Sequence, residues 1–560
     1  MAERPHELRV FTAARIHTMD PGRPVASAVS VADGSVVSVG SLDSMRPWLR
    51  RVPHTIDDRY ADRVLFPGFV DPHTHLRLSG TFAGLHYVGP IELAAPGALP
   101  PATTRDAVIE RLRQLVAATP LDPDGRAEPV VCWGYDPAAQ GGHLDRDLLD
   151  QVSDTVPVWV CAYAPHIVYT NTPMLALTGV DEGSDFHGLG RYPDGRLNGW
   201  FVETSAVAVA VRPVARTVYR EGFGRAALAR MGGVARDVGI TTTADMGWGF
   251  EDFDREWADH RSAIDEGELP LRVLLVPFEP ALQRRFGADA IDYHRSRIAL
   301  GDDRLAAHGV KFINDGSYPA MTLQLGKPGY LDGEHGLTGE IPWSDVYDRM
   351  LPYWNAGIQI HSHANGDATV DMTLDVLSRL QATTPRFDHR FVIEHYCLST
   401  PAQAHRLAAL GGVASVNAYF VKFRAQMHAD AGFGPDRSEA TARLGSLLRA
   451  GAPFALHSDF NLVVTPLSPL LVAEIAVTRL GADGVTVLAP GERISVDQAL
   501  RAVTIDAAYV LGRDASIGSI EVGKLADFAV LADDPYDVAP TAIGSIGVVD
   551  TVLGGEPTGR

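Results

Sequence analysis

The sequence of 560 residues predicts an α/β protein, a distorted (β/α)8 TIM barrel joined to a small composite β-sandwich domain. Three observations lead to this prediction. Short apolar runs alternate with stretches of helical periodicity through the middle of the chain. Short β-rich runs separated by Gly, Asp and Pro occupy both ends. Several of the central runs end in histidine or aspartate.

The two ends of the chain are predicted to form one β domain. The first part, residues 1–62, contains the runs LRVFTAARIHTM and SAVSVADGSVVSVG, and the second part, residues 516–560, contains GSIEVGKLADFAVL. Short β-rich runs between turn residues are typical of antiparallel strands. Because both parts have this pattern and flank a large middle region, we expect them to pair with each other.

The middle region, residues 63–515, is predicted to be the barrel. Its candidate strands are separated by segments of helical periodicity such as residues 367–381 and 400–410. Residues from about 77 to 228 interrupt this alternation, so we predict an inserted subdomain that covers the active site. The eight candidate strands are VLFPGFVDPHTH, TTTADMG, LRVLLVPFE, GVKFIND, IQIHSHA, RFVIEHY, GGVASVNAY and PFALHSD.

The composition argues against several classes of protein. The net charge of −20 disfavours a nucleic acid as the main ligand, because an acidic surface repels a polyanion. No run of about 18 apolar residues occurs and the N-terminus lacks a signal-peptide pattern, so we expect a cytoplasmic protein without membrane contact. Three cysteines without C-x-x-C spacing argue against a disulfide framework and a thiolate zinc site.

Six polar residues are predicted to share one site. Each lies at the C-terminal end of a candidate strand, and in a (β/α)8 barrel these ends converge on the active-site face. His73 and His75 are two residues apart, so on a strand their rings point to the same side. The six residues are His73, His75, Lys311, His363, His395 and Asp459.

This set has the composition of a metal site. Imidazole nitrogens with a carboxylate oxygen suit Zn²⁺ and are tolerable to Mn²⁺, Co²⁺ or Fe²⁺. A lysine buried beside metal ions should lose its proton and react with carbon dioxide, giving an anionic carbamate that bridges two metals. The alternative for Lys311 is an ion pair with Asp315 or a neighbouring carboxylate. The sequence leaves both alternatives open, and also whether one or two ions bind.

Motifs along almost the whole chain resemble those of the amidohydrolase superfamily. They are PGFVDPHTHL, GVKFINDGS, HANGDATVD, IEHY, HSD and GSIEVGKLADFAVL, in the order found in that family. More narrowly, they look like the amidohydrolase-3 branch, which includes N-substituted formamide deformylases, and CWGYDP and GRLNGWFVETS in the predicted insertion agree with this. The resemblance runs from about residue 8 to 553 and implies a metal-dependent hydrolase.

The resemblance also implies roles for the metal-site candidates. His73 and His75 would hold a first metal, and His363 and His395 a second one. Lys311 would be the bridging carbamate between them. The implied cofactor is therefore one or two Zn²⁺ ions.

The remaining candidates concern proton transfer and the pocket. A metal lowers the pKa of a bound water to about 7, so a metal-activated hydroxide is available to attack a carbonyl. We expect Asp459 to bind metal and shuttle the proton, and His166 to stabilise the oxyanion or grip the substrate. Trp133 and Glu203 are candidate pocket residues. His361 does not align with the ligand pattern and is interpreted as a deeper barrel residue or a partner of a ligand.

Three departures from the family pattern indicate a reshaped pocket. The segment NAYF, residues 417–420, stands where many relatives have Gln-Pro-x-His, and Tyr396 stands where a small residue is common. His457 replaces a glycine that relatives usually carry before Ser-Asp. Tyr396, Tyr419 and Phe420 are therefore predicted to bind an unusual substrate with aromatic character.

The predicted function is hydrolysis of a non-peptide C–N bond in a small amide or an N-acyl or N-formyl amine. The same metals also suit ester or lactone hydrolysis or decarboxylation, and a non-catalytic scaffold on the barrel is a second alternative. The expected partner is a small molecule, with neither nucleic acid nor membrane. A homodimer is a candidate assembly that the sequence does not decide.

Overall fold

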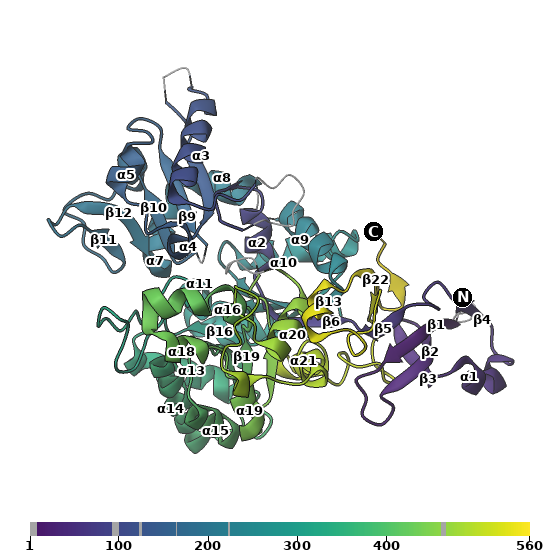
Figure 1. Cartoon of the computed structure of the whole chain (residues 1–560). Helices are drawn as coiled ribbons and strands as arrows, with labels where there is room; N and C mark the ends of the chain where they lie inside the picture. The colour runs from purple at the N-terminus through teal and green to yellow at the C-terminus, as the bar shows by residue number, and fades with distance from the viewer. Residues whose placement is uncertain are drawn as a thin grey trace.

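The computed structural model of the protein describes residues 8–91, 100–122, 126–163, 165–221, 224–460 and 466–559. Three groups of elements are visible in Figure 1. Parallel strands with helices form the central part, a second sheet contains strands from both ends of the chain, and a third sheet comes from the segment that follows the first central strand.

The strands of the central part are β6 (Phe69–Thr74), β13 (Ile240–Trp248), β14 (Arg272–Pro277), β15 (Leu305–Ala307), β16 (Val310–Ile313), β17 (Ile360–Ala364), β18 (Val392–His395), β19 (Val413–Val416) and β20 (Phe454–Leu456). They form two parallel arcs with the orders β15-β14-β13-β6 and β16-β17-β18-β19-β20. All eight candidate runs of the sequence contain one of these strands, and β15 is an additional short strand beside β14.

Backbone ladders do not close the two arcs into a continuous barrel among the described residues. The arcs meet on one side through a parallel bridge between Phe278 and Lys311, and on the other through contacts of β20 with β6. The strands are buried on both faces, which explains why they appear as continuous apolar runs. Their order and direction agree with a distorted barrel, and the closed (β/α)8 form stays an interpretation.

Helices cover the outside of the arcs. The predicted helical segments 367–381 and 400–410 correspond to α14 (Asp367–Thr383) and α15 (Pro401–Ala409). Thr400 and Gln403 form a capping box at the start of α15, with Pro401 in its first turn. The other helices of this part are α9 (Arg225–Asp237), α10 (Phe253–Asp265), α11 (Glu279–Phe286), α12 (Ala290–Ala299), α13 (Trp343–Asn355), α16 (Tyr419–Phe423), α17 (Ala425–His428), α18 (Pro435–Glu439), α19 (Leu444–Ala450), α20 (Pro469–Thr478), α21 (Val496–Ala502) and α22 (Ile505–Val510).

Both ends of the chain contribute to one eight-stranded sheet. Its strands are β1 (Leu8–His17), β2 (Val25–Ala32), β3 (Ser35–Gly40), β4 (His54–Asp57), β5 (Val64–Pro67), β21 (Phe528–Leu531), β22 (Val548–Leu553) and β23 (Glu556–Pro557), with α1 (Leu42–Leu49) after β3. Antiparallel pairing of β21 with β5 joins the C-terminal strands to the N-terminal ones, and Figure 1 shows the yellow and purple strands side by side. The strands are connected in a single sheet, so the division into two packed sheets that a sandwich requires stays a prediction.

The first candidate run contains two strands that belong to different sheets. In VLFPGFVDPHTH, β5 is part of the sheet from both chain ends and β6 begins the central part, so the predicted boundary at residue 63 falls before β5. Gly68 separates them. A Cβ atom there would lie 2.1 Å from Thr241 Oγ1, so only glycine fits this close approach. This close approach to the Thr241 side chain, which the apolar pattern does not encode, accompanies the change from one sheet to the other.

The segment between β6 and α9 contains a six-stranded sheet in the order β11-β12-β10-β9-β8-β7. Its strands are β7 (His86–Tyr87), β8 (Val130–Tyr135), β9 (Val158–Ala162), β10 (Ile167–Thr170), β11 (Leu189–Arg191) and β12 (Leu197–Val202). Its helices are α2 (Leu76–Phe82), α3 (Arg105–Ala118), α4 (Pro137–Gln140), α5 (Arg146–Asp150), α6 (Thr172–Thr178), α7 (Glu203–Val211) and α8 (Ala215–Glu221). This insertion lies over one end of the central part (Figure 1).

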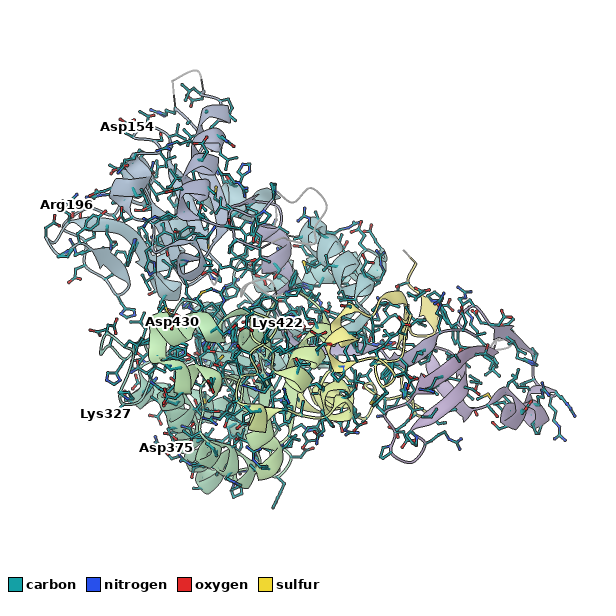
Figure 2. The ribbon with its side chains drawn as sticks, viewed as in Figure 1. Asp154, Arg196, Lys327, Asp375, Lys422 and Asp430 are labelled. Carbon is teal, nitrogen blue, oxygen red and sulfur yellow. The ribbon has the colours of Figure 1, made fainter. Side chains whose placement is uncertain are left out.

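Charged side chains also lie on the outside of the molecule, away from the buried ones of the central part. Figure 2 shows Asp154 and Arg196 at the outer edge of the insertion and Asp375 at the edge of the central part. Within the described ranges, no helix combines the length and the apolar character needed to cross a membrane. The cytoplasmic location stays a prediction.

Candidate functional site

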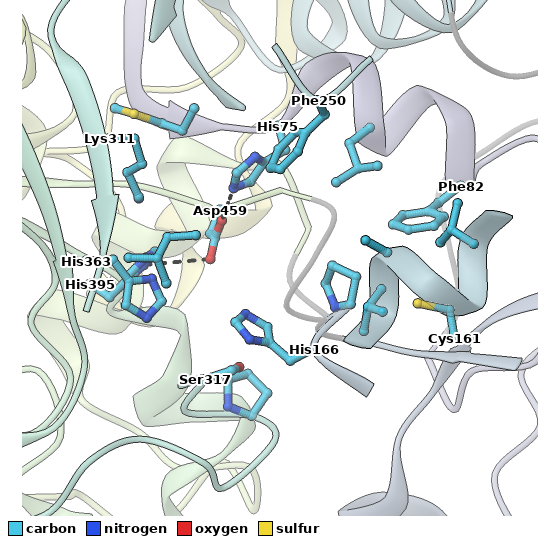
Figure 3. A pocket seen from close by; sticks show the side chains of 18 of the residues that line it. His75, Phe82, Cys161, His166, Phe250, Lys311, Ser317, His363, His395 and Asp459 are labelled. Atoms are coloured by element: carbon cyan, nitrogen blue, oxygen red, sulfur yellow. Dashed lines mark ion pairs between the residues drawn. The ribbon is translucent and has the colours of Figure 1, made fainter. Parts of the chain in front are cut away.

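A cavity of about 260 Å³ lies between the central arcs and the insertion (Figure 3). Its walls differ in chemistry. The central part contributes His75, Lys311, His363, His395 and Asp459, and the insertion contributes mainly Leu78, Phe82, Trp159, Cys161, Val207 and Val211. Five of the six predicted metal-site residues therefore line one cavity.

His73, the sixth, lies behind this wall with a fixed orientation. It is fully buried at the end of β6, and its Nδ1 is 2.7 Å from Glu394 Oε2. The other oxygen of Glu394 lies 2.6 Å from His361 Nδ1. Burial, with Lys311 nearby, lowers the pKa of His73, so its ring is neutral. A carboxylate on Nδ1 fixes the tautomer that leaves Nε2 free to bind a metal.

Asp459 and His75 stand beside this nitrogen. The backbone N–H of Asp459 donates to the carbonyl of His73 at 3.0 Å, which holds the loop after β20 against β6. Its Oδ1 lies 3.5 Å from His73 Nε2 and 3.3 Å from His75 Nε2. Burial by itself raises the pKa of Asp459, but the neighbouring rings of His75 and His73 outweigh this and hold the pKa well below its ordinary value. Asp459 is therefore an anion at neutral pH.

Lys311 lies deeper than predicted. It is the second residue of β16 and pairs with His361 in the ladder, not with His363. Its Nζ is 3.2 Å from His73 Nε2, and burial lowers its pKa although Glu394 and Asp459 oppose this. The carboxylate of Asp315 instead accepts backbone N–H groups of Asn365 and Gly366. The alternative ion pair between Lys311 and Asp315 is thus not formed in this structure.

His363 and His395 are neighbours, with ring centroids 4.6 Å apart. His395 Nδ1 lies 3.7 Å from Asp459 Oδ2, and its backbone φ of 71° is left-handed, a strained conformation typical of functional sites. His363 Nε2 is 3.0 Å from the carbonyl of Gly316 and 2.8 Å from Asn365 Nδ2. His363 therefore lines the cavity with its Nε2 already engaged.

Two groups of donors in the described residues are compact enough to hold a metal ion. In each group, one ligand atom per residue lies within 4.8 Å of the others. The first group is His73, His75 and Asp459, and the second is His73, His395 and His457. Neutral imidazoles with a carboxylate suit Zn²⁺, so the donor set fits a divalent cation. His363 belongs to neither group.

The insertion contributes one polar pair to the cavity. His166 lines it, and its Nδ1 is 2.7 Å from Glu203 Oε2. Burial lowers the pKa of His166, but the carboxylate of Glu203 outweighs this, so the pKa is raised overall. In Figure 3 the ring of His166 stands between the two walls of the cavity. Glu203 does not line this cavity. It contacts His166 and would not contact a ligand bound in the cavity.

Of the predicted aromatic pocket residues, only Phe420 lines the cavity, where it stacks on Tyr318 with 4.8 Å between centroids. Tyr419 points elsewhere and donates to the carbonyl of Ser468. Tyr396 is buried in the main apolar core, because its left-handed backbone (φ 48°) turns the chain after β18. Trp133 lies behind the wall and stacks on Phe82. These side chains shape the cavity indirectly.

Several important residues were not singled out from the sequence. Glu394 precedes His395 in a buried strand, and a charged residue inside an apolar strand is a signal that could have identified it. Asp71 accepts the backbone N–H groups of His73 and Ser458, and burial raises its pKa to about 7. The apolar insertion residues carry no such signal, because leucine, valine and phenylalanine are equally typical of a core.

Known proteins are similar to this chain in sequence and in fold. The chain is 27% identical over 562 residues to Protein LONG AFTER FAR-RED 3 of Arabidopsis thaliana, covering 98% of this chain and 91% of that protein. It is 25% identical to the N-substituted formamide deformylase of Arthrobacter pascens, covering 97% and 96%. In fold it is similar to a metal-dependent hydrolase of Pyrococcus horikoshii (TM-score 0.70, 20% identity, 95% and 99% covered). It is also similar to a zinc-bound adenosine deaminase of Xanthomonas campestris (TM-score 0.51, 15% identity, 99% and 93% covered).

A family model provides the assignment. The model described as amidohydrolase family matches residues 61–558, which include the first histidine pair, the buried lysine, the later histidines and the aspartate. The match also extends from the central part into the C-terminal strands. The chain belongs to the amidohydrolase family.

Proposed function

We propose that the protein is a metal-dependent hydrolase that cleaves a non-peptide C–N bond in a small amide, an N-acyl amine or an N-formyl amine. The observation that carries the proposal is the placement of a compact donor cluster on one wall of a cavity whose other wall is apolar. A cluster without a cavity would favour a structural ion, and a cavity without a cluster would favour simple binding.

The donor cluster fits a divalent cation, for which we propose Zn²⁺. His73, His75 and Asp459 provide the nearest set, with His395 close by. Both ring nitrogens of His457 have no hydrogen-bond partner among the described residues, which leaves them available to a ligand. When bound, such a cation supplies Lewis acidity, which lowers the pKa of a water molecule and polarises a carbonyl group.

The protein's own residues would move the proton and bind the substrate. Asp459 is anionic, buried and at the cavity wall, so it can accept a proton from the attacking water and return it to the leaving amine. His166 faces the same space and can donate a hydrogen bond to the carbonyl oxygen as negative charge develops there. Glu203 would keep His166 charged for this task.

The apolar wall supports a substrate with an apolar body. Phe82, Trp159 and Val211 line the side opposite the donors, and Phe250 and Phe420 line the sides provided by the central part. Such a surface favours aliphatic or aromatic groups over charged ones. The relative named N-substituted formamide deformylase supports an N-formyl or N-acyl amine as the reacting group.

Lys311 is proposed to carry a carbamate. Burial lowers its pKa and so favours the neutral amine, which can form an N–C bond with carbon dioxide while losing a proton. The new carboxylate would be a second anionic ligand of the cluster, in addition to Asp459. Lys311→Ala should then lose most activity and regain part of it with acetate or formate. Wild-type turnover in Lys311→Ala would exclude the carbamate.

A substrate panel tests the function. Purified protein is assayed with N-formyl and N-acyl amines bearing aliphatic or aromatic groups, and with matching esters, lactones and cyclic imides, while released amine, acid and carbon dioxide are measured. We expect amine release that is lost after dialysis against a zinc chelator and restored by Zn²⁺.

Other outcomes would redirect the proposal. Turnover of esters or lactones alone, or carbon dioxide as the product, would assign the site to a different reaction. Protein that contains no metal as isolated and turns over no substrate after metal addition would indicate a non-catalytic scaffold. The homodimer and the cytoplasmic location are not addressed by this assay and stay predictions.

A further inference from the structure

His457 is a buried histidine whose ring nitrogens are unexplained by the surrounding protein. It follows β20 directly and is 1% exposed. Neither Nδ1 nor Nε2 has a hydrogen-bond partner in the part of the chain that the structure describes. An imidazole always carries at least one N–H and usually one lone pair, and buried polar atoms are normally paired. Both nitrogens are therefore available to a ligand that is not part of the protein, and the neighbours of the ring decide which ligand that is.

The neighbours of His457 are two of the predicted metal ligands. Its ring stacks on that of His73, with centroids 4.7 Å apart and planes at 20°. It also meets the ring of His395 edge-on, at 5.1 Å and 64°. One nitrogen from each of the three rings lies within 4.8 Å of the other two. Three neutral imidazoles with this spacing are a set that Zn²⁺ binds in catalytic sites.

The hydrogen bonding of His73 limits how many ions this arrangement serves. Because Nδ1 of His73 faces Glu394, only Nε2 is available to a metal. The two donor groups share His73, so they describe the surroundings of a single ion at this nitrogen. His457 and His395 would be added to His75 and Asp459 in the shell from which that ion draws its ligands.

Contact with substrate does not explain His457. The cavity is lined by His75, Lys311, His395 and Asp459, and neither His73 nor His457 is part of its lining. His457 thus stands on the side of the cluster away from the cavity. A ligand at that position holds an ion without blocking the open side on which a water and a substrate must bind.

We propose that His457 is a direct ligand of the metal ion that His73 binds, with His395 as the third imidazole. The inference rests on the proposed function, which requires a cation in this cluster. It adds His457 to the ligands that the sequence resemblance implies for this site.

The test compares His457→Phe, His457→Asn and the matched control His428→Phe. Phenylalanine keeps the ring stacked on His73 but removes both nitrogens, so it separates ligation from packing. His428 is also fully buried, with both ring nitrogens unpartnered among the described residues, and packs on Tyr318 and Phe433 outside both donor groups. Zinc affinity is measured by competition with a chromophoric chelator, and the ligand field by the visible absorption of Co²⁺-loaded protein.

We expect His457→Phe to bind zinc at least about 100-fold more weakly than wild type, since loss of a mere partner of a ligand already costs 10- to 100-fold. Its Co²⁺ spectrum should change, and that of His428→Phe should not. His457→Asn should also lose affinity, and thermal unfolding of the apoproteins verifies that each variant folds. Wild-type affinity and spectrum in His457→Phe or His457→Asn would overturn the inference and leave metal-dependent hydrolysis intact, whereas a wild-type protein without metal would refute the proposed function itself.

Discussion

The two walls of the cavity are built on different principles. At and behind the wall from the central part, two donors are held by other buried polar groups: His73 by Glu394, and Asp459 by the backbone of His73. On the wall from the insertion, Phe82 and Trp159 are held by apolar packing, with Phe82 stacked on Trp133. Under the proposed function, the first wall would fix where the reaction takes place, and the second would determine which molecules reach it.

The insertion contributes more than an apolar surface. It sends one charged pair, His166 with Glu203, across to the reacting side. If the division between the walls is correct, changes on the first wall should reduce turnover for every substrate. Changes to the apolar part of the second wall should alter the choice of substrate. Substitutions of His166 should have the same kind of effect as substitutions on the first wall. The four predictions below test this division, beginning with the largest effect.

Asp459→Asn tests the wall from the central part. The substitution keeps the size of the side chain but removes the charge and the proton acceptor, so we expect kcat to fall by roughly 100- to 10,000-fold for all substrates. Steady-state kinetics on two substrates of different size, with metal content measured in parallel, checks this. Asp534→Asn, the same change at a buried aspartate that follows β21 and pairs with Arg15 and His17, is the control. A loss confined to one substrate would contradict the assignment of Asp459 to the chemistry.

His166→Asn tests the polar pair of the insertion. Removing one donor to a developing oxyanion costs about 100- to 1,000-fold in kcat, and we expect a loss in this range with unchanged metal content. His405→Asn, the same substitution at an exposed position on α15, serves as the control. A rise in KM with unchanged kcat would instead show that His166 binds the ground state and the transition state equally well.

The first wall could be predicted from the sequence and the second could not, for physical reasons. Donors such as His73 and Asp459 are polar residues at or shortly after the C-terminal ends of apolar strands, and parallel strands bring their ends together. The apolar residues of α2 and α7 face the cavity only because of how the insertion packs, which no local pattern encodes. Tyr396 and Tyr419 show the converse error: a position after a strand does not fix the direction of a side chain when the backbone turns there.

The contrast between local sequence patterns and contacts of distant segments also explains which parts of the fold could be predicted. All eight candidate strands exist because each has a buried apolar run, a strong local signal. The boundary at Gly68 and the connection of β21 with β5 depend on contacts between distant segments, so the sequence indicated the shared domain but not its division from the barrel. Lys311 lies one step deeper than predicted because a strand's register is set by its neighbours.

Phe82→Ala tests the apolar wall. Removing the ring deletes surface that contacts an apolar substrate, so we expect kcat/KM for the best aromatic or long-chain amide to fall about 10- to 100-fold. The smallest N-formyl substrate should be affected much less, and kcat at saturation should stay near wild type. Phe387→Ala, at a phenylalanine that is 98% exposed, is the matched control. Equal losses for large and small substrates would erase the distinction between the walls.

Glu203→Gln tests the connection between the walls through the pH dependence of kcat. Because Nδ1 of His166 faces the Glu203 carboxylate, Nδ1 carries the proton in the neutral ring, and Nε2 has a proton to donate only in the charged ring. The benefit from His166 is therefore present at low pH and lost as the pH rises through its raised pKa.

Glutamine removes the charge that raises this pKa, so the alkaline limb of the kcat profile should move to lower pH, with a small loss at the optimum. Glu182→Gln, at an exposed glutamate of the insertion, should leave the profile in place. The profile of His166→Asn should lack this limb altogether. If Glu203→Gln and wild type titrate at the same pH, the charge of His166 does not contribute to turnover, and the insertion acts on the substrate through its apolar surface alone.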